Sequence, residues 1–151
     1  MYTADDVGPR FVDGETIELS NANKQAIAEA WNMGAETNPQ EWRAIVAATR
    51  YAHEIAGTTF THSDGNTYGV ATDRQSQALV TGAAVQVQRT GENKRWKTAQ
   101  GFVTLTPDDV LALGDAVDSH VQAAFDREAE LLDKVADGSI SEADLETAWP
   151  T

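Results

Sequence analysis

The chain has 151 residues, which is enough for one ordinary domain with a hydrophobic core of its own. Its 24 acidic side chains against 11 Lys and Arg give a net charge of −13, so its field repels phosphate backbones and anionic lipid head groups. No cysteine is present, which excludes disulfides and thiolate zinc sites.

The apolar content favours closely packed helices in a soluble chain. Hydrophobic residues make up 41% of the sequence, but 24 of them are alanine, so fewer large side chains remain to fill a core. The N-terminus lacks the basic start and apolar run of a signal peptide, and no segment approaches the ~18 apolar residues of a membrane span. We therefore expect no export signal and no membrane partner.

Residues 1–36 are expected to form a hairpin followed by a helix. Asp13-Gly14 stands between two partly alternating segments, which is the strongest short-range signal for a two-residue hairpin turn. Ser20 can cap a helix over residues 21–33, where apolar residues recur at spacings of three and four.

Residues 39–56 are predicted to form the next helix. Asn38 supplies a capping side chain, and Pro39 suits the first helical position. Gly57 provides the left-handed stop.

A second hairpin and a further helix are predicted after Gly57. Residues 58–62 and 67–71 are rich in β-branched and aromatic side chains, and the residues between them favour a turn. Thr72 is expected to cap a helix that starts near Asp73 and is broken by Gly91, and its small residues invite close helix contact.

A third hairpin is predicted from residues 96–98 and 102–105, and the longest helix follows it. Thr106 can cap this helix, which is expected over residues 107–136 and to end at Gly138. Its expected apolar face consists of Val110, Gly114, Val117, Val121, Phe125, Leu132 and Val135.

The pattern divides the chain into three parts. Residues 1–36 form the N-terminal hairpin and helix, residues 37–137 form the main α+β domain, and residues 138–151 form a short C-terminal helix. Ile140, Leu145 and Trp149 give this last segment an amphipathic character.

The expected fold class is α+β and mainly α, with a bundle of about three longer helices and small two-stranded antiparallel hairpins packed against it. Isolated two-stranded ribbons are marginal in water, so each must lie on helices. The candidates for this covering layer are Tyr68, Val70, Trp96, Phe102 and Val103. If Phe102 is fully buried, its replacement by alanine should cost ~3 to 5 kcal/mol of stability.

Charge is unevenly distributed along the chain. Residues 74–100 carry five bases against one acid, whereas residues 101–151 carry two bases against twelve acids. The basic residues surround Trp96, which on a basic protein would suggest a nucleic-acid-binding surface with a stacking platform. Since the rest of the chain opposes phosphate, we expect no nucleic-acid partner and interpret the two regions as complementary surfaces, either within the molecule or at an interface.

The sequence contains no recognised catalytic or metal-binding motif, so we expect no catalytic residues, no metal and no cofactor. His53-Glu54 begins like a zinc protease helix, but Gly57 stands where the second histidine is needed. A metal site built from His53, His62 and a carboxylate would be required for the remote alternative of a metal-dependent hydrolase. We expect His53 and His62 to be surface or hairpin residues and His120 to lie at a packing margin.

About three-fifths of the chain, from about Arg43 to Val135, resembles an uncharacterised domain family of tailed bacteriophages and prophages, found beside or within tail-fibre and tail assembly proteins. The first specific likeness is the run Tyr68-Gly69-Val70-Ala71-Thr72-Asp73-Arg74-Gln75-Ser76-Gln77 with Gly82-Ala83. The second is Trp96-Lys97-Thr98, Gly101-Phe102-Val103, Leu105-Thr106 and a long helix with His120-Val121 and Phe125. The first 35 or so residues also look like the front ends of phage tail-fibre assembly proteins.

The resemblance implies a role in tail morphogenesis and supplies no catalytic residues. It makes a tail-fibre assembly factor, or chaperone, the leading expectation, with a virion structural subunit of the tail or baseplate as the alternative. The implied partner is a tail-fibre or other tail protein, or a second copy of the chain. The implied location is the host cytoplasm during assembly, or the virion tail if the protein is retained there.

The expected partner-binding residues are Trp96, Ile140, Leu145 and Trp149. The three C-terminal residues would form one apolar surface and the exposed edge around Trp96 would extend it. The alternative is that Trp149 folds back onto the core.

Overall fold

The computed structural model describes residues 3–8, 10–12, 15–17, 24 and 38–151, and it divides the chain into two compact units, Met1–Trp42 and Arg43–Thr151. In the first unit a 3-10 turn (η1, Ala4–Asp6) precedes strands β1 (Arg10–Val12) and β2 (Glu15–Ile17), which pair antiparallel. This confirms the predicted N-terminal hairpin. The Asp13-Gly14 turn and, except for Lys24, the helix predicted over 21–33 lie outside the described residues.

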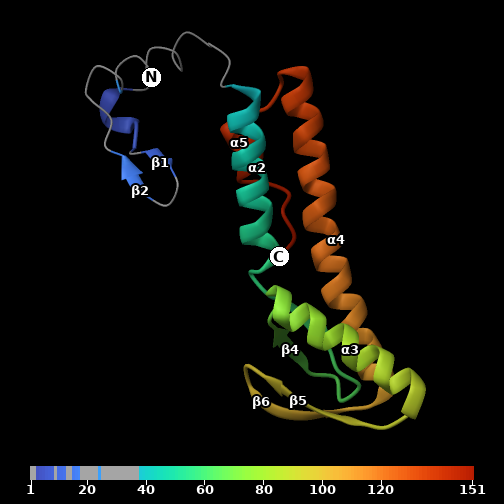
Figure 1. Ribbon diagram of the computed structural model, residues 1–151. Coiled ribbons are helices and arrows are strands. Elements are labelled where there is room, and N and C mark those ends of the chain that lie inside the picture. The colour runs from blue at the N-terminus through green and yellow to red at the C-terminus, as the bar shows by residue number, and fades with distance from the viewer. Residues whose placement is uncertain (1–2, 9, 13–14, 18–23, 25–37) are drawn as a thin grey trace. The chain divides into compact units, whose positions relative to one another are not determined.

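Residues 38–151 contain three longer helices and two hairpins, which confirms a mainly α, α+β fold. In chain order the elements are α2 (Pro39–Glu54), β3 (Thr58–Thr61), β4 (Thr67–Val70), α3 (Arg74–Thr90), β5 (Lys94–Thr98), β6 (Gly101–Leu105), α4 (Pro107–Asp137) and α5 (Glu142–Leu145). Helices α2 and α3 follow one another along α4, and the two hairpins gather at the N-terminal end of α4 (Figure 1).

Helix caps fix the ends of α3 and α4. The Thr106 hydroxyl accepts a hydrogen bond from the Asp109 N–H while the Asp109 carboxylate accepts one from the Thr106 N–H, and Gly138 ends α4 in the left-handed region at φ 76°. Asp73 caps α3 by accepting hydrogen bonds from two backbone N–H groups. The prediction that Thr72 caps this helix is therefore wrong.

The core joins the two hairpins to α3 and α4. Its buried members are Phe60, Val70, Val80, Val87, Leu105, Val110, Leu113 and Val117. A Cβ atom added at Gly114 would lie 3.9 Å from the Ala84 Cβ, so α3 and α4 approach closely there, as small residues allow. The two hairpins thus lie on helices, as isolated ribbons require.

The buried face of α4 differs from the predicted one. The buried positions are Asp109, Val110, Leu113, Val117, His120, Ala124, Leu131 and Val135. Phe125 remains 40% exposed. From Val110 to Val135 the buried positions recur at spacings of three, four and seven, so they form one narrow stripe that includes His120 and shares Val110, Val117 and Val135 with the predicted face.

Phe102 is 67% exposed, which contradicts its predicted place in the covering layer. The two-residue turn pairs Phe102 with Lys97 and Val103 with Trp96, so alternation sends the first pair to solvent and the second pair toward the core. The Arg95 guanidinium lies 5.8 Å from the centre of the Phe102 ring.

Replacing Phe102 by alanine is expected to change the free energy of unfolding by less than about 1 kcal/mol, because an exposed ring contributes little burial. Chemical denaturation of both proteins measures this difference. A loss of about 3 kcal/mol would show that the ring is buried after all.

A buried ionic cluster joins α2 to α3 and α4. Glu54 is 2% exposed, and its carboxylate pairs with Arg50 of the same helix and accepts a hydrogen bond from the Gln77 amide at 3.1 Å. Arg50 also donates to Glu128 of α4 at 3.1 Å, and its guanidinium lies 4.6 Å from the Phe125 ring centre. The Arg50–Glu54 pair therefore fixes the position of α2 against both other helices.

The Thr72 hydroxyl closes the junction between α2 and the β3–β4 hairpin. Thr72 is fully buried; its hydroxyl donates to the Glu54 carbonyl at 2.6 Å and accepts from the Gly57 N–H at 2.9 Å. Gly57 has φ 94°, and a Cβ added there would lie 3.1 Å from the Val70 carbonyl oxygen. A side chain at position 57 would therefore disturb both the turn and the hairpin.

Candidate protein-binding groove

An open groove of about 1090 Å³ lies where the β3–β4 hairpin, α3 and β5 meet. Its lining comes from the end of α2 and the turn after it (Ile55–Gly57), from Thr58–Thr59 and Gly69–Ala71 of the hairpin, from Ser76, Leu79 and Val80 of α3, from Trp96–Ala99 and from Thr151. Every one of these residues belongs to the second unit.

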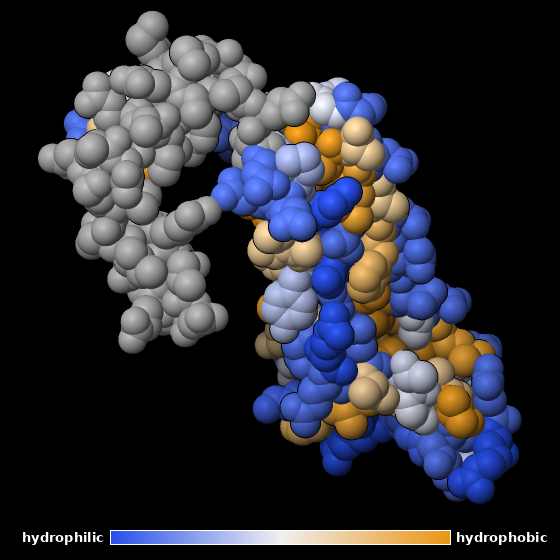
Figure 2. Space-filling view, turned by 45° about the horizontal axis from the view of Figure 1, so that its top comes forward, coloured by the Kyte–Doolittle hydropathy of each residue, from blue (hydrophilic) through white to orange (hydrophobic). Residues whose placement is uncertain are grey.

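Buried core residues line part of the groove, and its exposed lining includes large apolar side chains. Val70 and Val80 are 9% and 2% exposed, whereas Ile55 and Leu79 are 37% and 60% exposed. On the face shown in Figure 2, hydrophobic residues form separate patches within a mostly hydrophilic surface. An exposed apolar rim above a rigid floor is typical of a surface that binds another molecule.

Trp96 is the predicted partner-binding residue that lines this groove. It is half-buried, packs against the core cluster and also lines the groove. Its neighbour Lys97 also lines the groove.

The other three predicted partner-binding residues lie in the C-terminal segment, which folds onto α2 and α4. Trp149 is 9% exposed, its ring stacks on His53 at 4.9 Å between centroids, and its indole N–H donates to the Leu145 carbonyl at 2.8 Å. Ile140 and Leu145 are half-buried. The structure thus has Trp149 folded back, and of this segment Thr151 lines the groove.

Polar bonds fasten this segment to α4. The Asp144 carboxylate accepts a hydrogen bond from Lys134 at 2.5 Å, and its backbone carbonyl accepts one from Arg127 at 3.0 Å. The bond from Lys134, followed by those from Ser141, lowers the pKa of Asp144 from 3.8 to about 2. Asp144 therefore stays ionised at neutral pH and keeps the segment docked.

Sequence reasoning missed Leu79 and Ile55 as groove residues. The signal for Leu79 was present, since it falls outside the face of α3 that carries the buried Val80 and Val87 and the part-buried Ala83 and Ala84. An apolar residue of that size off the buried face is a candidate contact residue. No local pattern indicates that the end of α2 and β5 border the same groove.

His120 is buried at the α2–α4 interface, which contradicts its predicted place at a packing margin, whereas His53 is half-buried. His120 is 5% exposed, and its Nε2 donates to the His53 carbonyl at 2.9 Å, so Nε2 carries the proton. The His120 Nδ1 atom is buried and, among the described residues, has no hydrogen-bond partner. Both histidines therefore serve the packing of α2 and the C-terminal segment against α4.

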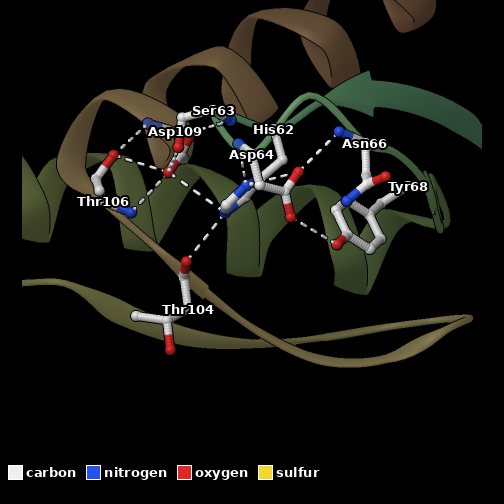
Figure 3. A network of polar contacts seen from close by, with 8 residues as sticks. All are labelled: His62, Ser63, Asp64, Asn66, Tyr68, Thr104, Thr106 and Asp109. Atoms are coloured by element: carbon white, nitrogen blue, oxygen red, sulfur yellow. Dashed lines mark hydrogen bonds and ion pairs between the residues drawn. The ribbon is translucent and has the colours of Figure 1, made fainter.

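A polar cluster ties the β3–β4 turn to the first turn of α4 (Figure 3). The Asp109 carboxylate accepts hydrogen bonds from the N–H and hydroxyl groups of both Ser63 and Thr106, at 2.8 to 3.0 Å. Burial would raise the pKa of Asp109, but these bonds outweigh it and lower the pKa from 3.8 to about 2. Asp109 is therefore an ionised, fully hydrogen-bonded carboxylate that both caps α4 and holds the β3–β4 turn against it.

His62 completes the cluster. Its Nε2 donates to the Thr104 carbonyl at 3.0 Å, and its Nδ1 lies 3.1 Å from the Asp64 carboxylate. The bond to Thr104 raises the pKa of His62 above 6.5, burial opposes the rise, and the carboxylates of Asp109 and Asp64 add to it. Because the Ser63 hydroxyl donates to Asp109, it forms no nucleophile–base pair with the imidazole.

The raised pKa of His62 predicts a pH-dependent contribution to stability. Protonated His62 is favoured in the folded state, so its contribution is complete below pH 6.5 and is lost as the pH rises through the folded pKa. The excess stability of the wild type over His62→Gln should therefore fall as the pH rises above 6.5. An NMR titration that places the His62 pKa at or below 6.5 would contradict this.

Neither histidine predicted for the hypothetical metal site has a metal-like environment. His53 stacks on Trp149, and His62 belongs to the Asp64–Asp109 cluster. Within residues 38–151 and the short described stretches before them, no three His, Asp or Glu side chains are grouped to hold a metal ion. No helix in that part of the chain is long and apolar enough to cross a bilayer.

Comparison with known families assigns most of the chain. Residues 36–148 match the domain of unknown function DUF4376, which covers both hairpins, α2 to α5 and almost the whole groove. The chain belongs to the DUF4376 family. No curated protein and no solved structure matches it significantly.

Proposed function

We propose that this DUF4376 protein is a phage tail-fibre assembly factor that acts by protein–protein contact through the groove and catalyses no reaction. The observation that carries the proposal is the apolar groove itself, in which Leu79 stays 60% exposed above a buried floor. A fixed apolar surface of this kind suits recognition of another protein. The tail context is supplied by the sequence resemblance around Tyr68–Gln77 and Trp96–Thr106.

The proposal can be tested in a tailed phage that carries this reading frame. Leu79→Asp places a charge on the groove rim and should reduce the yield of fibre-bearing particles at least tenfold, because an unpaired carboxylate in an apolar interface is costly. Val85→Asp is the matched control, since Val85 is also 60% exposed on α3 but does not line the groove. Electron microscopy counts the fibres, and equal yields from both variants would exclude the groove.

The same particles separate an assembly factor from the alternative of a tail or baseplate subunit. An assembly factor acts in the host cytoplasm and should be absent from purified particles or present below the copy number of the fibre. A structural subunit should be present at a fixed ratio to other tail proteins. Quantitative mass spectrometry measures this ratio, and a fixed ratio would favour the subunit.

A further inference from the structure

One wall of the groove is formed by the end of β5 and the turn after it. β5 pairs with β6 and with no other described strand, and the groove is lined by four consecutive residues, Trp96–Ala99, but by no residue of β6. Every second residue of an antiparallel strand directs its N–H and C=O away from its partner. Such unpaired groups are a template for a further strand. The edge of β5 that faces away from β6 therefore carries backbone groups to which a further strand can bond.

The remaining surface of the groove can select apolar side chains. Leu79 and Ile55 form an exposed apolar rim, and Trp96 borders the groove on the β5 side. Successive side chains of an extended segment point to opposite faces, so alternate side chains of an added strand would face this surface. An apolar side chain at one of those positions would cover Leu79.

The charge beside the groove is positive although the chain is acidic. Residues 74–100 carry five bases and one acid, and in the described structure no ion pair involves Lys94, Arg95 or Lys97. Interactions between exposed charges are largely screened beyond about 8 Å at physiological salt. Lys97, which lines the groove, therefore attracts a carboxylate in spite of the net charge of the chain.

We infer that the groove binds an extended acidic segment of a partner protein, which adds as a strand to the free edge of β5. An apolar side chain of the segment packs against Leu79, and a neighbouring carboxylate pairs with Lys97. This inference rests on the proposed function of the groove and specifies the chemistry of the partner segment.

The test uses a yeast-displayed library of random ten-residue peptides, selected against the full chain. The enriched peptides should alternate apolar and polar residues and carry at least one Asp or Glu. Methylation of alternate backbone nitrogens in the best peptide should weaken binding at least tenfold, because strand addition needs those N–H groups. No enrichment, enrichment of peptides without acidic residues, or insensitivity to methylation at every position would overturn the inference.

Two charge reversals locate the contact. Lys97→Glu should weaken binding of the best peptide at least tenfold, whereas Arg89→Glu, the same charge change on α3 outside the groove, should change it less than threefold. Circular dichroism confirms that both variants are folded. Equal losses in the two variants would indicate a general field effect and contradict a contact at Lys97.

The peptide experiments and the particle yield of Leu79→Asp test the inference and the proposed function separately. If Leu79→Asp abolishes fibre-bearing particles while the peptide experiments fail, the groove is the binding surface and the partner does not bind as an acidic strand. If the peptide experiments succeed while Leu79→Asp leaves particles unchanged, the groove binds strands but does not act in fibre assembly.

Discussion

Replacing Glu54 by alanine is expected to lower the free energy of unfolding by about 3 kcal/mol, which is a large share of the stability of a domain of this size. Glu54 is 2% exposed and is bonded to Arg50 and to the Gln77 amide. Removal of the Glu54 carboxylate leaves Glu128 as the remaining carboxylate partner of the part-buried Arg50 guanidinium. Denaturant unfolding of both proteins gives the difference.

A surface pair on α4 provides the control. The Glu130 side chain is 65% exposed and pairs with Arg127 at 2.9 Å, so Glu130→Ala should cost less than about 1 kcal/mol. Glu54→Gln, which keeps the shape and an acceptor oxygen, should cost less than Glu54→Ala. If the variants at positions 54 and 130 lose the same stability, the junction between α2, α3 and α4 contributes no more than a surface pair.

Leu113→Ala is expected to lower the free energy of unfolding by about 2 to 5 kcal/mol. Leu113 is fully buried in the cluster that joins α3, α4 and both hairpins, so truncation removes transfer free energy and leaves a cavity. Thermal and denaturant unfolding should agree on the loss if the second unit unfolds in one step.

Leu79→Ala is the matched control for this prediction. Leu79 is the same residue type at 60% exposure, so its truncation should cost less than about 1 kcal/mol. The same variant should still weaken partner binding through the groove. A loss of stability at position 79 as large as that at position 113 would mean that Leu79 is buried. This result would contradict an exposed apolar rim at the groove.

Local signals predicted most of the elements of the second unit. The capping pair Thr106–Asp109 and Gly138 mark the ends of α4, and the turn residues between 62 and 67 and between 98 and 101 fix both hairpins. The exposure of Phe102 could also have been predicted. A two-residue turn pairs it with Lys97, and a lysine indicates which face of the ribbon meets solvent.

Tertiary contacts decided what the sequence left open. Asp73 and Thr72 are both good capping residues, and only the packing of α2 against the hairpin assigns the Thr72 hydroxyl to Glu54 and Gly57. The groove depends in the same way on segments far apart in the chain, so of its residues only Trp96 was predicted as a binding residue. The sequence is compatible with a contact of Trp149 either to a partner or to the core. In the structure Trp149 stacks on His53, so it packs against the rest of the chain.

Hydrogen exchange of the full chain, with and without the best peptide from the library, tests the central claim most directly. If the groove is the binding surface, the amides of β5 from Lys94 to Thr98 should exchange at least tenfold more slowly in the complex. The C-terminal half of α4 should be unchanged. Protection centred on α4 and α5, with none in β5, would contradict the groove as the surface through which this protein acts.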